Sequence, residues 1–228
     1  MPEVIALIPA YNAASCLSET IAALRSLPEI GTIMVVDDGS SDGTAEIAIA
    51  TGVEVLVHHR NQGKGAALNT GLQALRRREF TALALVDSDL GPSAAGFADL
   101  TRPIINGEAD MTIARFPKTV RRGGFGLAKG FCRLGLRVFT GQWFEAPMSG
   151  QRVLTAAIVS RLSGFASGWG CEAALTIDVH RLSGRILEVQ VMMTHHETDR
   201  NLSGFKHRGR QLLAAARVFA AKAIHGKA

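Results

Sequence analysis

Cysteine is scarce in the chain, and long hydrophobic runs are absent. The three cysteines, Cys16, Cys132 and Cys171, lie far apart and have neither disulfide nor metal-binding spacing. A low cysteine content is typical of a reducing compartment, so we expect a cytoplasmic protein. No apolar run reaches the roughly eighteen residues of a membrane-spanning helix. The N-terminus also lacks the basic region and cleavage site of a signal peptide, and none is expected.

Internal repeats, low-complexity tracts and the common phosphate-binding motifs are missing as well. Residues 61–69 contain glycine and lysine, but in the spacing of neither a P-loop nor a G-x-G-x-x-G motif. The charge balance is mild, because 25 basic and 20 acidic residues give a net charge of +5. That balance suits an anionic ligand or a membrane surface, and we expect no nucleic-acid partner.

The first half of the chain alternates segments of strand length with segments of helix length. We predict strands at 4–8, 32–36, 53–58, 82–86 and 110–114, and helices at 17–27, 45–51, 64–78 and 94–105. Strands separated by helices indicate right-handed βαβ units and a mostly parallel α/β sheet covered on both faces. In the second half we predict helices at 127–139, 157–162, 172–182 and 208–224, and a strand at 186–192. The 228 residues are enough for one domain with a full core.

Two of the predicted strands end in carboxylates. Asp37 and Asp38 follow one strand, and Asp87-Ser88-Asp89 follows another. Open α/β sheets bind ligands at the carboxyl ends of their strands, and an extended D-x-D directs both carboxylates to one side. Mg²⁺ or Mn²⁺ takes such oxygen ligands together with the phosphates of a substrate. The pair of motifs therefore predicts a metal–diphosphate site, while each motif alone is also typical of a solvated turn.

Lys64 opens a predicted helix between two glycines, Gly63 and Gly65. Glycines at a helix start let backbone N–H groups approach an anion, and the helix dipole favours negative charge there. Lys64 would add a full positive charge to such a site. The alternative is an ordinary capped helix.

Histidine pairs follow two of the predicted strands. His195 and His196 come after the last strand, and imidazole is a ligand for Mn²⁺ alongside carboxylates. Arg200 follows closely and suits a diphosphate leaving group or an anionic acceptor, the alternative being a solvated basic face. We interpret the other pair, His58 and His59, as structural.

Together these blocks resemble the family-2 glycosyltransferases, which have the GT-A fold and use nucleotide sugars. The matching blocks, in the order and spacing of that family, are residues 8–12, 35–44, 61–71 and 86–89. They span about the first 90 residues. In combination they are far more specific than any one of them.

The second half is similar to two groups within these enzymes. Residues 168–172, Asp178 and residues 194–200 are similar to the C-terminal part of glucosyl-3-phosphoglycerate synthases. The sequence Ser-Gly-Gln-Arg at 149–152 is similar to the Ser-Gly-x-Arg of dolichyl-phosphate sugar synthases.

The resemblance implies how a sugar donor would bind. Asp38, or else Asp37, would accept a hydrogen bond from the N3–H of the base. Lys64 would lie near the diphosphate, and Asp87, with Ser88 beside it, would contact the ribose or the sugar. The stretch that would pack on the uracil and ribose comprises Pro9, Ala10, Tyr11 and Asn12.

The resemblance also implies a metal site and an acceptor side. Asp89 matches the metal ligand and therefore takes part in catalysis. His196 or His195 would complete the metal site. Glu172 lies where inverting relatives carry a catalytic carboxylate near the acceptor.

We therefore expect a GT-A glycosyltransferase of the hexosyltransferase type that depends on Mg²⁺ or Mn²⁺ and uses a UDP-sugar, with a GDP-sugar as the next choice. Residues 1–115 would form the nucleotide-sugar-binding core, and residues 116–228 the acceptor-side region and C-terminal helix of the same domain. The expected acceptor is a small phosphorylated molecule or a lipid phosphate.

Several alternatives stay open at this point. One is a polyprenyl-phosphate sugar synthase bound peripherally at the inner face of the membrane, because residues 127–139 and 208–224 are basic and amphipathic. Another class is a nucleotidyltransferase, or a binding protein for nucleotide sugars that has lost catalysis. A homodimer is a further alternative.

Overall fold

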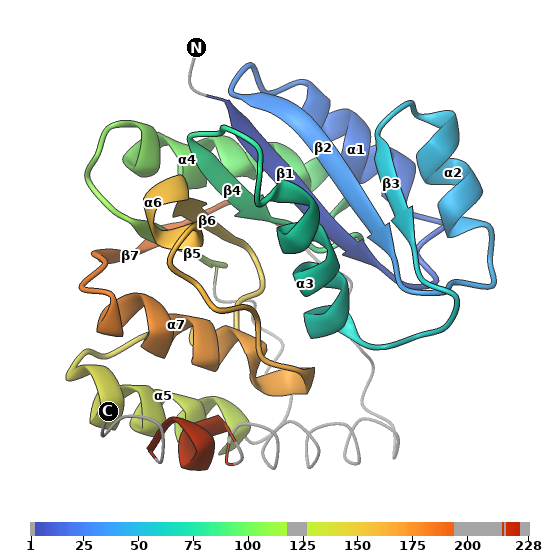
Figure 1. Cartoon of the computed structure of the whole chain (residues 1–228). Helices are drawn as coiled ribbons and strands as arrows, with labels where there is room; N and C mark the ends of the chain where they lie inside the picture. Colours follow the sequence, from blue (N-terminus) through green and yellow to red (C-terminus); the bar gives the residue numbers. More distant parts are fainter. Residues whose placement is uncertain (1–2, 118–126, 194–215, 217, 224–228) are drawn as a thin grey trace.

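One mixed sheet runs through the part of the chain that the computed structural model describes, residues 3–117, 127–193, 216 and 218–223. Its strand order is β3-β2-β1-β4-β6-β5-β7, with helices on both faces (Figure 1). The strands are β1 (Val4–Ala10), β2 (Ile30–Asp37), β3 (Glu54–Val57), β4 (Ala82–Leu85), β5 (Met111–Arg115), β6 (Arg152–Thr155) and β7 (Ile186–Gln190).

The helices connect these strands in the alternating pattern that the sequence predicts. They are α1 (Leu17–Arg25), α2 (Thr44–Ala50), α3 (Lys64–Leu75), α4 (Phe97–Ile105), α5 (Leu127–Thr140), α6 (Ala156–Val159) and α7 (Cys171–Arg181). Two short 3₁₀ helices, η1 (Gly91–Gly96) and η2 (Gly168–Gly170), precede α4 and α7. The predicted helix at 94–105 therefore begins as a 3₁₀ turn, and the one at 157–162 is only the single turn of α6.

The first four strands run parallel, because a helix returns the chain to the same end of the sheet before each new strand begins. β1 pairs in parallel with both β2 and β4, and β2 pairs in parallel with β3. β5 and β7 also pair in parallel. The carboxyl ends of β1, β2 and β4 consequently meet at one edge, as expected.

β6 is the strand that sequence analysis missed. It runs antiparallel to both of its neighbours, β4 and β5, so the sheet is mixed rather than wholly parallel. The strand has four residues, Arg-Val-Leu-Thr, and Arg152 is 1% exposed. A buried arginine at the head of so short a segment hides the apolar pattern by which strands are recognised.

Each face of the sheet carries its own apolar core, because successive side chains of a strand point to opposite faces. Ile5 and Leu7 of β1 pack with α3, α5, α6 and α7, whereas Val4, Ala6 and Ile8 pack with α1, α2 and α4. The central strands are thus buried on both sides. This explains their nearly continuous apolar sequence.

α5 packs along α7 at the lower edge of the view in Figure 1. Gly135 of α5 leaves room for the ring of Phe219, which a side chain at that position would overlap. The Phe219 ring lies 5.7 Å from each of the rings of Phe131 and Phe139. Residues 218–223 are helical, and the rest of the helix predicted at 208–224, apart from 216, lies outside the described residues. Among the helices described, none is long and apolar enough to cross a membrane.

Candidate active site

The loops that follow β1 and β2 are joined at the carboxyl edge of the sheet. The strand order changes direction beside β1, which is where open α/β sheets bind ligands. Asn12 N donates to Ser40 Oγ over 2.9 Å, and Ser41 N donates to Asn12 Oδ1 over 3.0 Å. Asn12 has a φ of 50°, a left-handed conformation that asparagine tolerates better than most residues. Tyr11, just before it, is 51% exposed and could stack on a ligand.

Asp37 and Asp38, at the end of β2, are both buried. Asp37 accepts hydrogen bonds from the backbone N–H and the hydroxyl of Ser40, and so closes the loop after the strand. Asp38 accepts from Gln62 N over 2.9 Å and from Gly63 N over 2.6 Å. The two carboxylates thus fix the loops on either side of β2.

His58 adds a third partner to Asp38. Its Nδ1 lies 2.7 Å from Asp38 Oδ1, and its Nε2 lies 2.8 Å from Thr70 Oγ1 on α3. Sequence analysis gave His58 only a structural role and did not connect it with Asp38. A carboxylate has about four acceptor positions, and three protein groups already contact the carboxylate of Asp38. Its contact with a nucleobase stays a prediction.

Lys64, the first residue of α3, forms ion pairs with two carboxylates. Its Nζ lies 2.7 Å from Asp87 Oδ1 and 3.2 Å from Glu172 Oε1. Desolvation alone would lower the pKa of Lys64, but Asp87 and Glu172 outweigh it and raise that pKa above its ordinary value. Lys64 is therefore a permanent cation between the end of β4 and the start of α7. Three residues predicted separately from the sequence lie together here.

Gln151, which sequence reasoning did not select, completes this cluster. The side chain is fully buried, accepts from Asp87 N over 3.0 Å and donates to Asp87 Oδ2 over 2.6 Å. Next to it, a Cβ on Gly150 would lie 2.7 Å from both Asp87 Oδ2 and Lys64 Nζ. Glycine is therefore required where this backbone passes the ion pair.

The loop Asp87-Ser88-Asp89 is fixed to α1 through Thr20. The Thr20 hydroxyl donates to Ser88 O over 3.0 Å and accepts from Gly91 N over 2.8 Å. Asp89 is partly exposed, and no hydrogen bond or ion pair joins it to another of the described residues. Its carboxylate is thus available to a ligand.

A divalent cation fits this arrangement through few protein ligands. Nowhere in the described ranges do three or more His, Cys, Asp or Glu side chains gather as a metal site. Mg²⁺ is commonly held by only one or two carboxylates together with substrate phosphates, and the role of Asp89 as such a ligand stays a prediction. The predicted ligands His195 and His196, and also Arg200, lie outside the described residues.

The segment that leads into β6 is organised around buried Arg152. Its Nε donates to Ser149 O over 2.9 Å, and its guanidinium donates to Thr176 Oγ1 over 2.9 Å. Burial lowers the pKa of Arg152 to about 10, which still leaves it charged at neutral pH. Ser149 Oγ is buried and has no hydrogen-bond partner among the residues that the structure describes. Burial raises the pKa of the Cys171 thiol to about 12, so this cysteine is no nucleophile at neutral pH.

Glu172 lies in the first turn of α7, where the helix dipole favours a carboxylate. Gly65 of α3 packs against the segment before α7, and a side chain at that position would overlap the carbonyl oxygen of Ala166. The close approach of α3 to the segment before α7 brings Lys64 within reach of Glu172. The site therefore combines one lysine held between two carboxylates with Asp89, whose carboxylate has no partner among the described residues.

The sequence profile of the glycosyl transferase family 2 matches residues 5–139, and the chain belongs to this family. The chain has the GT-A fold, as expected, and its family membership favours the expected glycosyltransferase over the nucleotidyltransferase alternative. Its structure is similar to glucosyl-3-phosphoglycerate synthase from Mycobacterium tuberculosis in complex with phosphoglyceric acid. The TM-score is 0.78 at 25% identity, over 96% of this chain and 80% of that one. The complex of that enzyme with Mn²⁺, UDP-glucose and phosphoglyceric acid gives a TM-score of 0.77 at 24% identity, with the same coverage of 96% and 80%.

Curated relatives match over part of their length. An uncharacterized protein of Methanocaldococcus jannaschii is 32% identical over 137 residues, which are 55% of this chain and 55% of that protein. Glycosyltransferase AglJ of Haloferax volcanii is 25% identical over 179 residues, 75% of this chain and 56% of that protein. The chain thus spans about half the length of these relatives.

Proposed function

We propose that the enzyme transfers a sugar from a UDP-sugar to a small phosphorylated acceptor, with Mg²⁺ or Mn²⁺ bound through Asp89. The observation that carries this proposal is the cluster of Lys64, Asp87, Gln151 and Glu172, together with Asp89 two residues after Asp87, whose carboxylate has no partner among the described residues. The similar structures support it, since they hold UDP-glucose, Mn²⁺ and phosphoglyceric acid, or Mg²⁺ and UDP.

The proposed roles follow from the position of each side chain. When bound, the cation would neutralise charge on the departing nucleoside diphosphate. Lys64 would supply a second positive charge close to the diphosphate, already oriented by its two carboxylates. Asp87, held by Gln151, would contact the ribose or sugar, and Glu172 would face the acceptor hydroxyl.

We also propose that the two parts of the chain divide the substrates. Residues 1–115 would bind the sugar donor, because they supply both strand-end carboxylate motifs and Lys64. Residues 116–228 would bind the acceptor, because they supply the loop before β6 and Glu172. Gln151 and Glu172 reach across to Lys64 and Asp87, so donor and acceptor would meet at this cluster.

Release of UDP from a panel of UDP-sugars, with Mg²⁺, Mn²⁺ or EDTA, tests the proposal. Phosphoglycerate and glycerol 3-phosphate would serve as acceptors, because the similar structures contain them. We expect UDP release that needs both metal and acceptor, and that is lost in Asp89→Asn. The matched control is Asp99→Asn, on the exposed surface of α4. Turnover of GDP-sugars alone would contradict the donor assignment, and no turnover of any UDP-sugar would contradict the whole proposal.

A second candidate, transfer to a polyprenyl phosphate at a membrane surface, is favoured by one face of α5. Leu134 and Val138 are 60% and 75% exposed, and Phe131 and Trp143 extend the same apolar surface. The basic residues of this helix are Lys129, Arg133 and Arg137. An apolar stripe flanked by positive charge is typical of helices that lie on anionic membranes.

Sedimentation with vesicles tests this second candidate. We expect the protein to bind vesicles that contain anionic lipid and not neutral ones, and expect Leu134→Asp to abolish binding. Ile49→Asp is the matched control, since Ile49 is 61% exposed on α2. If the protein does not bind vesicles and Leu134→Asp instead converts a dimer to a monomer in gel filtration, this face of α5 is an interface between copies of the chain.

A further inference from the structure

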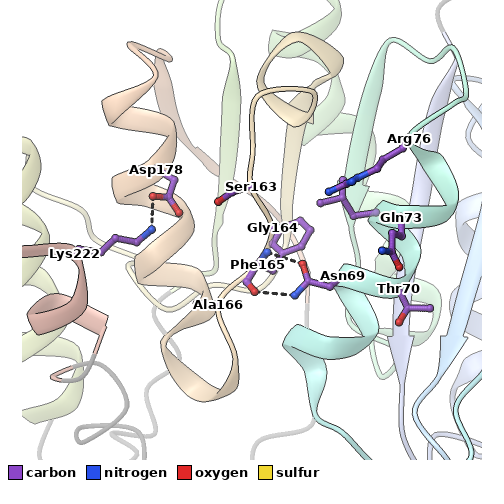
Figure 2. A pocket seen from close by; sticks show the side chains of 11 residues that line it. Asn69, Thr70, Gln73, Arg76, Ser163, Gly164, Phe165, Ala166, Asp178 and Lys222 are labelled. Atoms are coloured by element: carbon purple, nitrogen blue, oxygen red, sulfur yellow. Dashed lines mark hydrogen bonds and ion pairs between the residues drawn. The ribbon is translucent and has the colours of Figure 1, made fainter. Parts of the chain in front are cut away.

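A polar pocket of about 460 Å³ lies along α3, on the side of that helix that faces the segment before α7. Asn69, Gln73 and Arg76 line it at intervals of four and three residues, so they form one stripe on the helix. Ser163 to Ala166 form the middle of the pocket, and Asp178 and Lys222 form the opposite wall (Figure 2). None of these residues belongs to the cluster around Asp87.

Two hydrogen bonds between α3 and the segment before α7 fix the shape of the pocket. Asn69 Nδ2 donates to Phe165 O over 2.8 Å, and Phe165 N donates to Asn69 Oδ1 over 2.7 Å (Figure 2). Gly164, between Ser163 and Phe165, has a φ of 147°, which favours glycine. Because Asn69 clamps the main chain in both directions, the shape of the pocket exists before any ligand arrives.

The charges that line the pocket favour an anion. Arg76 points from α3 toward the middle of the pocket (Figure 2), and it forms no ion pair with a carboxylate among the described residues. Lys222 faces it from the other wall and is paired with Asp178. Two cations and one carboxylate leave a net charge of +1 on the lining. Arg78, two residues further on, is by contrast neutralised by Glu54.

We propose that this pocket binds a small anion that carries a phosphate or carboxylate group, as a site separate from that of the sugar donor. The guanidinium of Arg76 can bind such a group through two parallel hydrogen bonds. Gln73 and Ser163 add neutral hydrogen-bond donors. Leu72 and Phe165 contribute apolar lining, and the volume of the pocket lies within the range of small-molecule sites.

The pocket also has a physical link to the active site. Thr70 lines the pocket and hydrogen-bonds His58 Nε2, while His58 Nδ1 reaches Asp38. Asp38 in turn holds the backbone of Gln62 and Gly63, directly before Lys64. An anion bound against α3 would therefore contact the helix whose first residue organises the catalytic cluster.

Titration of the ¹⁵N-labelled protein with inorganic phosphate, at ionic strength matched with sodium chloride, tests the proposal. The signals to follow are the side-chain amides of Asn69 and Gln73 and the backbone amides of residues 163–166. We expect saturable shifts in the wild-type protein. Arg76→Gln should weaken phosphate binding at least about tenfold, because a charge-assisted contact is lost.

Arg77→Gln is the matched control, because Arg77 is the exposed neighbour of Arg76 and does not line the pocket. It removes the same charge and should leave the affinity unchanged. Absence of saturable shifts in the wild-type protein would overturn the proposal. Equal weakening in both variants would also overturn it, since phosphate would then respond to net charge alone. These signals do not depend on UDP or on turnover, so the result stands apart from the proposed sugar transfer.

Discussion

The side-chain amide of Gln151 hydrogen-bonds both the backbone and the carboxylate of Asp87, over 3.0 Å and 2.6 Å. Asp87 Oδ1 simultaneously accepts from Lys64 over 2.7 Å. The orientation of this carboxylate is therefore set from two sides, by the residue before β6 and by the start of α3. Its geometry is fixed before any substrate binds.

Replacing Gln151 by leucine should destabilise the protein and impair catalysis together. Gln151→Leu removes the fully buried amide that accepts from Asp87 N and donates to Asp87 Oδ2. We expect the free energy of unfolding to fall by about 1–3 kcal/mol. We also expect kcat/KM to fall, because the carboxylate of Asp87 is no longer oriented. Urea denaturation and steady-state kinetics measure the two effects.

Gln142→Leu is the control for that substitution, since Gln142 is exposed in the loop after α5. It should change neither quantity. If Gln151→Leu were as stable and as active as Gln142→Leu, the two hydrogen bonds between Gln151 and Asp87 would contribute neither to stability nor to catalysis.

Replacing Lys64 by methionine should lower the free energy of unfolding by the same amount at all pH values near neutrality. The pKa of Lys64 lies above its ordinary value of 10.5 in the folded state. A raised pKa means that the stabilisation is fully present below 10.5 and is lost only as the pH rises through the folded-state value. In Lys64→Met, Asp87 and Glu172 both lose the cation with which they pair. The difference in unfolding free energy between wild type and Lys64→Met should stay constant from about pH 7 to 9. A difference that shrinks steadily across this interval, in denaturant titrations at each pH, would show that Lys64 is not held charged.

Asp89 should matter to nucleotide binding only when metal is present. A cation that bridges carboxylate and diphosphate contributes nothing in its absence, so Asp89→Asn should weaken UDP binding at least about tenfold with Mn²⁺. The same substitution should have little effect with EDTA. Calorimetric titration of UDP under both conditions measures this, with Asp99→Asn as the control. Equal affinities of wild type and Asp89→Asn in Mn²⁺ would remove Asp89 from the metal site.

His58 should stabilise the fold far more than its neighbour His59. His58→Leu removes the hydrogen bonds to Asp38 and Thr70, both formed by a nearly buried ring. We expect the free energy of unfolding to fall by about 1–3 kcal/mol. His59→Leu changes an exposed side chain and should alter it by less than about 0.5 kcal/mol. Thermal or urea denaturation compares the two, and similar losses would mean that the ring contacts of His58 are unimportant.

The polar residues of the first half that the structure brings together can be selected from the sequence, because their signals are local. Asp37, Asp38 and Asp87 directly follow apolar runs, and Lys64 directly follows a glycine that begins a helix. The edge of the sheet then brings them together without further information. Glu172 needed the family resemblance, since an acidic residue in the first turn of a helix is an ordinary feature.

The contacts that sequence reasoning missed join residues far apart in the chain. Gln151 lies 64 residues from Asp87, and His58 lies 20 residues from Asp38. Neither glutamine nor histidine at a strand end predicts a partner, and β6 was itself unrecognised behind Arg152. Without β6 nothing places Gln151 beside β4. The contacts of Gln151 and His58 therefore become visible only in three dimensions.

The antiparallel course of β6 has a consequence for how new specificities could arise. Because β5 and β6 are neighbours in the sheet, residues 116–150 leave and return at the same edge, where Ala114 N donates to Gln151 O over 3.0 Å. Loop closure becomes only slightly less favourable with length, about 0.6 kcal/mol for each doubling. Within this segment α5 packs along α7 and adds Cys132 and Leu136 to the core, so an exchanged segment must supply an equivalent helix for the strands beneath it to keep their register. The chain thus contains an insert whose two ends are fixed next to each other in the sheet, near Asp87, and exchange of that insert together with its helix between family members would show whether it sets the choice of acceptor.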